Sequence, residues 1–559
     1  MGASNMFPVD QLEKLNVPVT RLVTDSRAVR QGDTFVAYPG EKADGRQFIA
    51  QAIAQSANAV IYEAQHFVWD AAWQIPNLAV NDLRHKAGWL ADAVYGTPSE
   101  KLQMIGVTGT NGKTTTSHWI AHALNDAGKR CALIGTLGNG FPGGNGIADA
   151  LQASANTTPD AIHVHGLLAD YLRAEAQAVA MEVSSHALAQ GRVNGVRFDV
   201  ALLTNLSRDH LDYHGDMESY AASKRKLFDW QELKFAVINL DDAFGAELAE
   251  RMLQGDYCPA NPHPNPNPNP PPMPSPQSSP ARGRGGKRKK QLLIPAGEGA
   301  NEALRAISTP EVIGYGLSDP ALQLAERLGL RMVYGHLAEM SGQGLRLNVH
   351  SSWGGAQINS MLVGRFNASN LLGALAVLLV SDVTLDEAVQ SLSKVQAVAG
   401  RMQRLGNASQ PTVIVDYAHT PDALEKVLLA LREVSAPAEG KLICVFGCGG
   451  DRDRGKRAMM GLVAEKFSDH CIVTSDNPRS EDPQRIIAEI LGGMTAHNHE
   501  VIVERVAAIE RGIGLARQCD TVLLAGKGHE DYQEINGVKY PFSDVTVAGR
   551  ALQAWRAST

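Results

Sequence analysis

The stretch "GVTGTNGKTTT" (residues 106–116) restricts the fold of this 559-residue chain more than any other feature. It lies between the strand-like run "KLQMI" and a helical pattern from about Thr114 to Ala127. Its glycines allow successive backbone N–H groups to face one anion, and the N-terminus of the helix adds partial positive charge. Lys113 can then reach the β- and γ-phosphates, while the Thr114 hydroxyl suits Mg²⁺. The stretch therefore predicts an ATP or GTP site.

The spacing of this loop departs from the general G-x-x-x-x-G-K-[ST] pattern. Val107 occupies the position of the first glycine, and Gly106 lies one residue earlier. The alternative interpretation is a glycine-rich turn that contains a lysine by chance. The strand before the loop and the helix after it favour the phosphate loop.

Strand-like and helix-like stretches alternate along most of the chain. Continuous apolar runs such as "AQAVAMEVS" and "FDVALLTNL" are typical of parallel strands that are buried on both faces. The alternation restarts at residue 411 with "PTVIVDYA" and continues to "DTVLLAGKG", which predicts a second sheet. The first hundred residues form a smaller unit of the same kind. We therefore expect an α/β fold with three domains, at residues 1–100, 101–398 and 399–559.

The composition agrees with a chain of several soluble domains. A hydrophobic content of 44% and a charged content of 20% are typical of globular proteins. The longest apolar run, "LLGALAVLLV" (371–380), is far shorter than the roughly 20 residues of a membrane span. The N-terminus shows no secretory pattern and the six cysteines form no CxxC pair, so we expect a cytoplasmic protein with reduced thiols. A net charge of −7 does not favour a nucleic-acid partner.

One segment, residues 259–291, does not fit any core. It holds 11 of the 27 prolines, which exclude helix and central strand, and then six basic residues and no acidic one. We interpret it as a disordered or polyproline-like insertion within the second domain. A solvated loop is the favoured interpretation, and contact with an anionic surface or RNA is the alternative.

Ten motifs identify a family when they are read in order along the chain. They are "GTNGKTT", "NTTPD", "MEVSSHAL", "TNLSRDHLDYHGDMESY", "GRFNASN", "GRMQRL", "DYAHTPDAL", "GCGGDRDRGKR", "DNPR" and "AGKGHEDYQ". Together they closely resemble the Mur ligases of peptidoglycan synthesis, over nearly the whole chain apart from the insertion. Within that family they best match the ligases that add the third peptide residue.

The resemblance implies an enzyme with three roles for its three domains. A small N-terminal α/β domain would hold the UDP end of the substrate, a central P-loop domain with a parallel sheet would bind ATP, and a C-terminal Rossmann-like domain would bring the amino acid. The family phosphorylates a substrate carboxylate with ATP, and the amine then attacks the acyl phosphate. The implied substrate is UDP-N-acetylmuramoyl-L-alanyl-D-glutamate, and the implied cofactor is Mg²⁺. We expect a monomer.

Four residues would carry the chemistry by this resemblance: Lys113, Glu182, His210 and Lys224. Glu182 ends a buried strand, where a carboxylate suits Mg²⁺; an ion pair is its alternative role. His210 would be a further metal ligand, although a lone histidine is more often structural. In related ligases the lysine that matches Lys224 is carbamylated, which converts a cation into an anionic oxygen ligand. Lys226 is a nearby competitor for this role.

The resemblance also assigns the substrate contacts. The residues expected around ATP are Gly109, Thr110, Asn111, Gly112, Lys113, Thr114, Thr115, Asn367, Asn370, Arg401 and Asp416. Those expected around the UDP-muramoyl dipeptide are Thr24, Ser26, Glu41, Lys42, Ala43, Asn156, Thr157, Thr158, Ser184, Gln190 and Arg192. Arg192 is the natural partner of a glutamate carboxylate in this set.

Arg479 indicates which amino acid is added. Meso-diaminopimelate differs from lysine by a carboxylate on its far carbon, and arginine offers a bidentate geometry that lysine lacks. Ligases with "DNPR" resemble the diaminopimelate-adding branch, so the expected amino-acid pocket is Arg452, Asp476, Asn477, Pro478, Arg479, Gly526 and Glu530. The alternative for Arg479 is a surface pair with Glu481 or Asp482.

Three other functions stay open at this point. The chain could be a lysine-adding Mur ligase, a folylpolyglutamate-type ligase, or a nucleotide-binding regulator that has lost catalysis. The acceptor substrate distinguishes the ligases. The regulator would be expected to lack Lys113, Glu182, His210 or Lys224, and all four are present.

Overall fold

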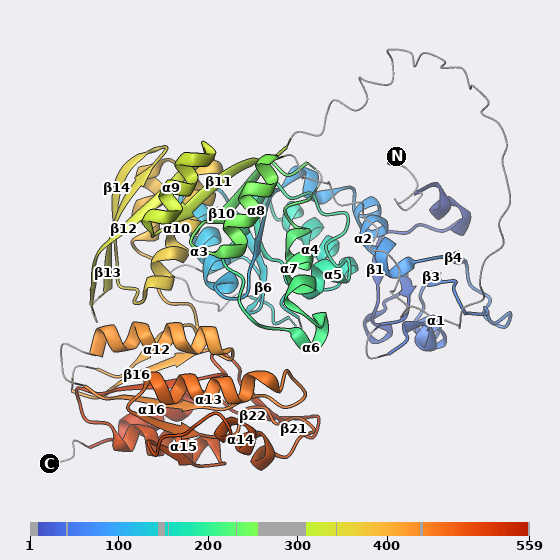
Figure 1. The fold of residues 1–559 in the computed structure, drawn as a ribbon. Coiled ribbons are helices and arrows are strands. Elements are labelled where there is room, and N and C mark those ends of the chain that lie inside the picture. Colours follow the sequence, from blue (N-terminus) through green and yellow to red (C-terminus); the bar gives the residue numbers. More distant parts are fainter. Residues whose placement is uncertain are drawn as a thin grey trace, which may run out of the picture.

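The computed structural model describes residues 9–40, 43–143, 151–154, 156–230, 232–254, 309–341, 344–407, 409–435 and 440–556. The expected insertion at 259–291 lies outside these residues, as do Glu41 and Lys42. Three large sheets follow one another along the described chain, and a two-stranded sheet accompanies the last of them (Figure 1). None of the helices in the described ranges is long and apolar enough to cross a lipid bilayer.

The N-terminal sheet has four parallel strands in the order β1-β2-β3-β4. Their bounds are Leu22–Val23, Thr34–Ala37, Ala59–Glu63 and Asn77–Val80. Helices α1 (Ile49–Ala54) and α2 (Leu83–Val94) pack on it.

The central sheet has ten strands in the order β14-β13-β12-β11-β10-β9-β5-β8-β6-β7. The strands from β12 to β6 in that order are parallel, and antiparallel strands close both edges. The bounds are β5 Gln103–Thr108, β6 Cys131–Gly135, β7 Gly138–Gly140, β8 Ala178–Glu182, β9 Val200–Leu203, β10 Phe235–Asn239, β11 Glu311–Gly316, β12 Arg331–Ser341, β13 Gly344–Ser351 and β14 Gly354–Ser360.

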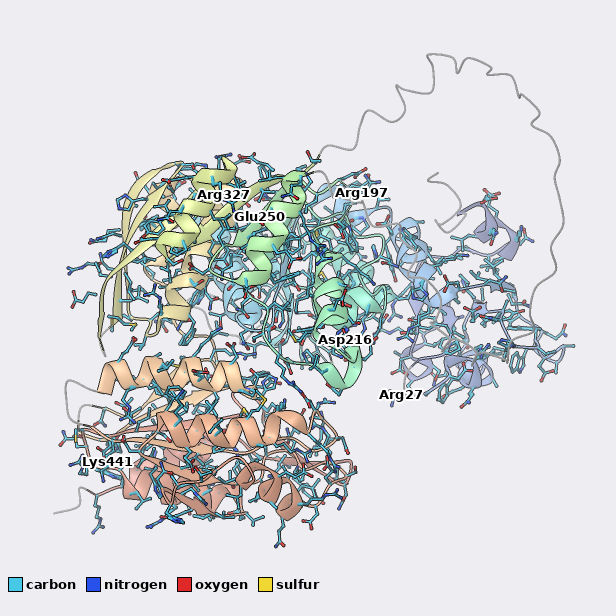
Figure 2. The ribbon with its side chains drawn as sticks, viewed as in Figure 1. Arg27, Arg197, Asp216, Glu250, Arg327 and Lys441 are labelled. Atoms are coloured by element: carbon cyan, nitrogen blue, oxygen red, sulfur yellow. The ribbon has the colours of Figure 1, made fainter. Side chains whose placement is uncertain are left out.

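Helices cover both faces of the central sheet, and each face has its own apolar core. One core contains α3 (Lys113–Asp126), α10 (Arg365–Val380) and α11 (Leu385–Leu392). The other contains α4 (Ala161–Arg173), α8 (Ala243–Gln254) and α9 (Asp319–Leu328). Figure 2 labels Glu250 on α8 and Arg327 on α9, whose ion pair joins two neighbouring helices of this second layer.

Three short helices follow β8 and β9 and carry predicted site residues. They are α5 (Ser185–Ala189), α6 (Leu211–His214) and α7 (Met217–Arg225). Asp216, labelled in Figure 2, caps α7 by accepting the backbone N–H of Ser219 at 2.7 Å. The cap fixes where α7 begins, and thereby which side chains its buried face presents.

The C-terminal sheet has the order β15-β16-β20-β17-β18-β19, with only β15 antiparallel to its neighbour. The strands are β15 Gln403–Leu405, β16 Thr412–Asp416, β17 Leu442–Phe446, β18 His470–Val473, β19 His499–Val501 and β20 Thr521–Ala525. The helices are α12 Pro421–Ser435, α13 Gly455–Phe467, α14 Pro483–Leu491, α15 Arg505–Leu515 and α16 Asp544–Ala554. A separate hairpin joins β21 (Tyr532–Ile535) to β22 (Val538–Pro541).

The two larger sheets face each other across α12. Figure 1 shows α12 along the side of the C-terminal part that is turned towards the central part. The carboxyl ends of parallel strands are where open α/β sheets bind ligands. The ends of β5, β8 and β9 in one sheet, and of β16, β18 and β20 in the other, are therefore the places to look for a site.

Candidate active site

The loop between β5 and α3 requires its glycines. Gly109 has a φ of +146° and Gly112 a φ of +87°, and residues other than glycine rarely adopt such backbone angles. A Cβ at Gly109 would lie 1.9 Å from the Thr204 hydroxyl, and one at Gly112 would lie 2.6 Å from Asn370 Oδ1. The loop can therefore keep its shape, and its N–H groups their direction, only with glycine at both positions.

Two lysines meet at one carbonyl of this loop. The Nζ atoms of Lys113 and Lys224 donate to Gly109 O at 2.9 and 2.8 Å. Burial lowers the pKa of Lys113, and burial together with the charge of Lys113 lowers the pKa of Lys224 well below its usual value. Lys224 is 1% exposed, so water contributes little to stabilising a second positive charge there. The geometry favours a neutral amine at Lys224.

Glu182 ends β8 beside this loop and is fully buried. Its Oε2 accepts the Thr114 hydroxyl at 2.8 Å and the Thr136 hydroxyl at 3.1 Å, and its Oε1 accepts the Thr136 N–H at 2.7 Å. Within the described residues, these contacts of the carboxylate are hydrogen bonds from neutral groups, and the nearby charge of Lys113 acts on it without a close contact. A buried carboxylate and a hydroxyl side by side are oxygen donors of the kind that Mg²⁺ prefers.

His210 lies at the start of α6 with a φ of +55°. Its Nε2 is 3.3 Å from an oxygen of Asp209, and its ring packs edge-on against His186 at 4.8 Å between centroids. Burial lowers the pKa of His210 to about 3, which leaves a neutral imidazole. In the described part of the chain no three His, Cys, Asp or Glu side chains converge as a metal site. A metal ion bound by Glu182 and His210 would therefore need further ligands of another kind.

A cavity of about 530 Å³ opens next to the loop, between elements of the two larger sheets. Seven of the residues predicted around ATP line it: Asn111, Gly112, Thr115, Asn367, Asn370, Arg401 and Asp416. Residues that sequence reasoning missed also line it, among them Asp241, Arg365, Phe366 and Tyr417. The cavity brings α10 and the phosphate loop opposite α12 and the end of β16.

Side chains cross this cavity from one sheet to the other. Arg401 Nη2 donates to the Thr114 hydroxyl at 3.4 Å, and Asn111 Nδ2 donates to Asp422 at 3.0 Å. The Arg401 guanidinium lies 4.3 Å above the Tyr417 ring. Asp416 accepts the N–H groups of Met402 and Ala418, both at 2.7 Å, although burial raises the pKa of its carboxyl. The central and C-terminal parts thus share one site.

The residues predicted around the muramoyl dipeptide divide into two groups. Those beside Glu182 are connected: Thr158 donates to Glu182 O at 2.8 Å, and Arg192 donates to Thr158 O at 3.0 Å and to Gln190 at 2.7 Å. Thr157 and Ser184 belong to the same neighbourhood: Thr157 accepts the Thr136 hydroxyl at 3.0 Å, and Ser184 caps α5. Asn156 precedes Thr157 in the chain, and its carbonyl accepts the Ser154 hydroxyl at 2.6 Å.

The second group lies on the N-terminal sheet, separate from the first. Ser26 is buried and donates to Gln51 at 2.9 Å, next to Thr24. Ala43 is described, whereas Glu41 and Lys42 lie outside the described residues. The two groups would contact different ends of one extended ligand.

The residues predicted for the amino acid come together at the ends of β18 and β20. Asn477 Nδ2 donates to Glu530 Oε2 at 2.7 Å. Lys527 is fully buried, and its Nζ lies 3.0 Å from Asn477 Oδ1, 3.1 Å from Glu530 Oε2 and 3.4 Å from Asp476 Oδ1. Lys527 was missed by the sequence reasoning, although it stands within "AGKGHED" beside Gly526. Its ammonium holds Asp476, Asn477 and Glu530 in one cluster.

Arg479 does not pair with Glu481 or Asp482, so the surface-pair alternative is wrong. Its Nε lies 3.4 Å from Glu534, and its Nη1 donates to Gly450 O at 2.7 Å. The physical reason is competition: Glu481 binds Arg457 and Arg454, and Asp482 caps α14.

Arg452 lies near Arg479 and is exposed. A Cβ at Gly449 would be 2.8 Å from Arg479 Nη1 and 3.7 Å from Arg452 Cγ, so both side chains flank this glycine. Pro478 precedes Arg479 in the loop after β18, and its carbonyl accepts the N–H of Glu481 at 3.0 Å. The predicted pocket therefore has two guanidinium groups near its mouth.

Thr136 was also missed in the sequence, because it lies outside every quoted motif. Its signal is its place directly after a buried strand that neighbours β8. Glu534 was missed too, although the dipeptide Asn536-Gly537 between "YQEI" and "VKYP" is a strong hairpin signal.

The fold and the site define a class of proteins in which two α/β sheets close over a nucleotide. Three family models match the chain: "Mur ligase family, catalytic domain" at residues 18–95, "Mur ligase middle domain" at 107–258 and "Mur ligase, glutamate ligase domain" at 400–528.

Curated relatives match over almost the full length. A UDP-N-acetylmuramoyl-L-alanyl-D-glutamate--2,6-diaminopimelate ligase of Chromobacterium violaceum is 47% identical over 97% of this chain and 96% of its own. A ligase of the same name from Nitrosomonas europaea is 44% identical over 97% and 94%. A solved structure with this name is 34% identical, with a TM-score of 0.59 over 96% of this chain and 95% of its own.

MurF from Acinetobacter baumannii shares the fold at 18% identity, with a TM-score of 0.61 over 98% of each chain. The chain belongs to the Mur ligase family, whose members are ATP-dependent amide ligases.

Proposed function

We infer that this chain joins meso-2,6-diaminopimelate to the γ-carboxylate of the D-glutamate in UDP-N-acetylmuramoyl-L-alanyl-D-glutamate, with hydrolysis of ATP. The reaction makes a peptidoglycan precursor. The observation that carries this inference is the similarity, over nearly the full chain, to relatives that bear the name of this ligase. ATP supplies the driving force, because a carboxylate is a poor electrophile and a phosphoryl group makes one of its oxygens a good leaving group.

The phosphate loop would hold ATP, with Lys113 and the N–H groups of residues 109–115 directed at its phosphates. Thr114 and Glu182 would hold Mg²⁺, supported by their adjacent oxygens. The ion would supply charge neutralisation for the phosphates. His210 would join this site through a neutral ring nitrogen, in agreement with its lowered pKa.

Lys224 would act as a carbamate. A neutral amine attacks the carbon of CO₂, an N–C bond forms, one C=O electron pair moves to oxygen, and the nitrogen loses a proton. The lowered pKa and the burial of Lys224 support this reaction, because only the neutral amine is a nucleophile. Lys226 has a less strongly lowered pKa and a less buried side chain, which favours Lys224 of the two.

The remaining residues would bind the substrates in separate sections of the site. Asn367, Asn370, Arg401 and Asp416 would contact the nucleotide from both sides of the cavity. Thr24, Ser26 and residues 41–43 would hold the uridine end, while residues 156–158, Ser184, Gln190 and Arg192 would hold the dipeptide. Closure of the two sheets would exclude water, which would otherwise hydrolyse the acyl phosphate.

Arg479, with Arg452, Asp476, Asn477, Pro478, Gly526 and Glu530, would select the amino acid. The distal carboxylate of diaminopimelate would lie on the Arg479 guanidinium. Glu530 Oε2 already accepts from Asn477 and Lys527, which leaves Oε1 for the distal ammonium. Lysine would leave Arg479 without its anion, and an unpaired charged group lowers affinity strongly.

Three domains at 1–100, 101–398 and 399–559 are our proposed division, supported by one large sheet in each. We also propose that the enzyme acts as a monomer in the cytoplasm, where ATP is available. Light scattering of the purified chain would test whether the enzyme is a monomer.

The deciding experiment offers the enzyme ATP, Mg²⁺ and the UDP-muramoyl dipeptide with meso-diaminopimelate or L-lysine in parallel. Phosphate release and product mass are measured. We expect turnover with diaminopimelate and at least about a hundredfold lower kcat/KM with lysine. Preference for lysine would leave a Mur ligase with a different specificity. No turnover with either amino acid would favour a folylpolyglutamate-type ligase or a regulator.

A further inference from the structure

The β21–β22 hairpin is built against the loop that carries Arg479. The backbone N–H of Arg479 donates to Glu534 O at 3.0 Å, and the N–H of Asn536 donates to Arg479 O at 2.7 Å. Gln533 Nε2 donates to Asp476 O at 2.6 Å, and the Glu534 N–H donates to Asn477 Oδ1 at 2.9 Å. The hairpin therefore adds a strand-like pairing to a loop that has no other strand beside it in the described residues.

The hairpin itself has a defined turn. Asn536 and Gly537 have φ values of +51° and +76°, the pattern of a tight two-residue connection. This turn sets the register in which Glu534 faces Arg479. Arg479 also has a positive φ, +52°, which few residues other than glycine adopt without support from neighbouring structure.

Two of the three nitrogens of the Arg479 guanidinium already have partners. Nε lies 3.4 Å from Glu534 Oε2, and Nη1 donates to Gly450 O. Among the described residues Nη2 has no hydrogen-bond partner, so the edge that includes Nη2 is the one available to a ligand. A guanidinium that is fixed at Nε and Nη1 presents that edge in one direction, which is what bidentate binding of a carboxylate requires.

We propose that Glu534 is a positioning residue for amino-acid selection: through its pair with Arg479 it aims the guanidinium at the distal carboxylate of the incoming amino acid. The inference rests on the proposed function and deepens it. The carboxylate of Glu534 contacts Arg479, so its proposed effect on the amino acid passes through the Arg479 guanidinium.

Two effects of Glu534 oppose each other, and their magnitudes decide the outcome. Its negative charge weakens the attraction of Arg479 for a carboxylate, but the pair is partly exposed, with side chains 20% and 26% accessible, so solvent screens this effect. Solvent does not weaken the effect of Glu534 on the orientation of the guanidinium. A misdirected guanidinium loses the two parallel hydrogen bonds that distinguish diaminopimelate from lysine.

The test compares Glu534→Gln with the wild type and with Glu250→Gln. Gln keeps the shape and removes the ion pair. Glu250→Gln breaks a more exposed Glu–Arg pair, with Arg327, on α8 and α9 of the central part. We expect Glu534→Gln to lower kcat/KM for diaminopimelate about tenfold, mainly through KM, with little change for lysine. Glu250→Gln should leave both unchanged.

A double-mutant cycle with Arg479→Lys then shows whether Glu534 acts through Arg479. In the Arg479→Lys background, Glu534→Gln should have almost no further effect on the ratio of the two kcat/KM values. Equal losses in both backgrounds, or tighter diaminopimelate binding in Glu534→Gln, would overturn the proposal. Glu534→Asp, which keeps the charge on a shorter side chain, should restore part of the selectivity.

These measurements distinguish a failure of this inference from a failure of the proposed function. A wild type that prefers lysine or shows no turnover contradicts the proposed function, whatever the variants do. A selective wild type with an unchanged ratio in Glu534→Gln contradicts only the role of Glu534. Thermal unfolding midpoints are measured in parallel, because a purely structural role would lower them without changing the ratio.

Discussion

Lys224 is the residue whose surroundings differ most from those of an ordinary lysine. It is enclosed next to Lys113, and its pKa is lowered well below the usual value by burial. We expect Lys224→Arg, which keeps a positive charge but cannot form the carbamate, to lower kcat by at least about a hundredfold. With ¹³C-bicarbonate, the wild type should show a carbamate carbonyl signal in NMR spectra that Lys224→Arg lacks. Full activity in Lys224→Arg would exclude the carbamate.

His118 on α3 makes the stability of the protein depend on pH. Burial lowers its pKa from 6.5 to about 4, Arg401 adds to this shift, and its Nε2 has no hydrogen-bond partner in the described residues. The unfolded chain then binds more protons than the folded one between pH 6.5 and 4. The stability from neutral His118 is complete above pH 6.5 and is lost as the pH falls towards 4.

The corresponding variant is His118→Gln. From pH 7 to pH 5 the wild type should lose about 2 kcal/mol more unfolding free energy than this variant, at about 1.4 kcal/mol per pH unit. Urea unfolding at the two pH values measures the difference. His163→Gln, at an exposed position of α4, serves as the control and should behave like the wild type. The pKa of His529 is lowered by burial, by Arg401 and, to a smaller extent, by His118, so its own contribution changes little in His118→Gln.

At the scale of single residues, the sequence indicated the residues that we propose as catalytic, but it did not indicate the residues that support them. Lys113 and Glu182 stand in motifs, because the roles proposed for them require a given side chain at a given spacing. Thr136, Lys527 and Glu534 each have a local signal for their position, but their contacts join segments far apart in the chain, and the local pattern does not name the partner. The alternative role of Arg479, a surface pair with Glu481 or Asp482, is wrong for the same reason.

Among the elements, α7 begins at a helix cap and carries Lys224, which we propose as a catalytic residue. Tyr220, Ser223 and Lys224 share its buried face at helical spacing, and Tyr220 lies 3.1 Å from the Thr110 hydroxyl. Asp216→Ala removes the N-cap, so the first turn should fray and Lys224 should be held less well. We expect a several-fold lower kcat and a lower unfolding midpoint.

Asp216→Asn is the matched variant, since asparagine caps helices about as well as aspartate. It should stay close to the wild type in kcat and in the thermal midpoint measured by circular dichroism. If both variants lose activity equally, the charge of Asp216 matters and the cap does not.

Long elements with a clear pattern were predicted well, and their ends less so. The helix expected from Thr114 to Ala127 is α3, which begins and ends one residue earlier. Asn367 and Asn370 lie in the first turns of α10, which begins at Arg365 and is buried on nearly every side. The short hairpin escaped notice, since its stability comes from the loop it pairs with.

For the molecule as a whole, the Pro-rich and basic segment at 259–291 offers a direct test. It connects α8 to β11, and β10 and β11 are parallel neighbours with Phe235 opposite Glu311. Deleting 259–291 changes the cost of closing the loop by less than about 1 kcal/mol. We expect kcat, KM and the unfolding midpoint to stay at wild-type values.

The same deletion tests the alternative that the segment binds an anionic partner. The wild type and the deleted protein are compared for binding to single-stranded RNA and to vesicles with anionic lipid. Equal binding supports a passive loop. Weaker binding by the deleted protein would establish a second activity that is independent of catalysis.

The pairing of β10 with β11 also has a consequence for how such chains diverge. The connection between β10 and β11 begins and ends in one sheet, because the two strands are paired with each other and neither is an edge strand. Selection on catalysis should therefore hardly act on the length of this connection. Insertions there should accumulate almost neutrally, while insertions in the turn at Asn536-Gly537 should be removed. Among relatives, the distance between the strands that match β10 and β11 should therefore vary widely in length, and the hairpin should keep its two-residue turn.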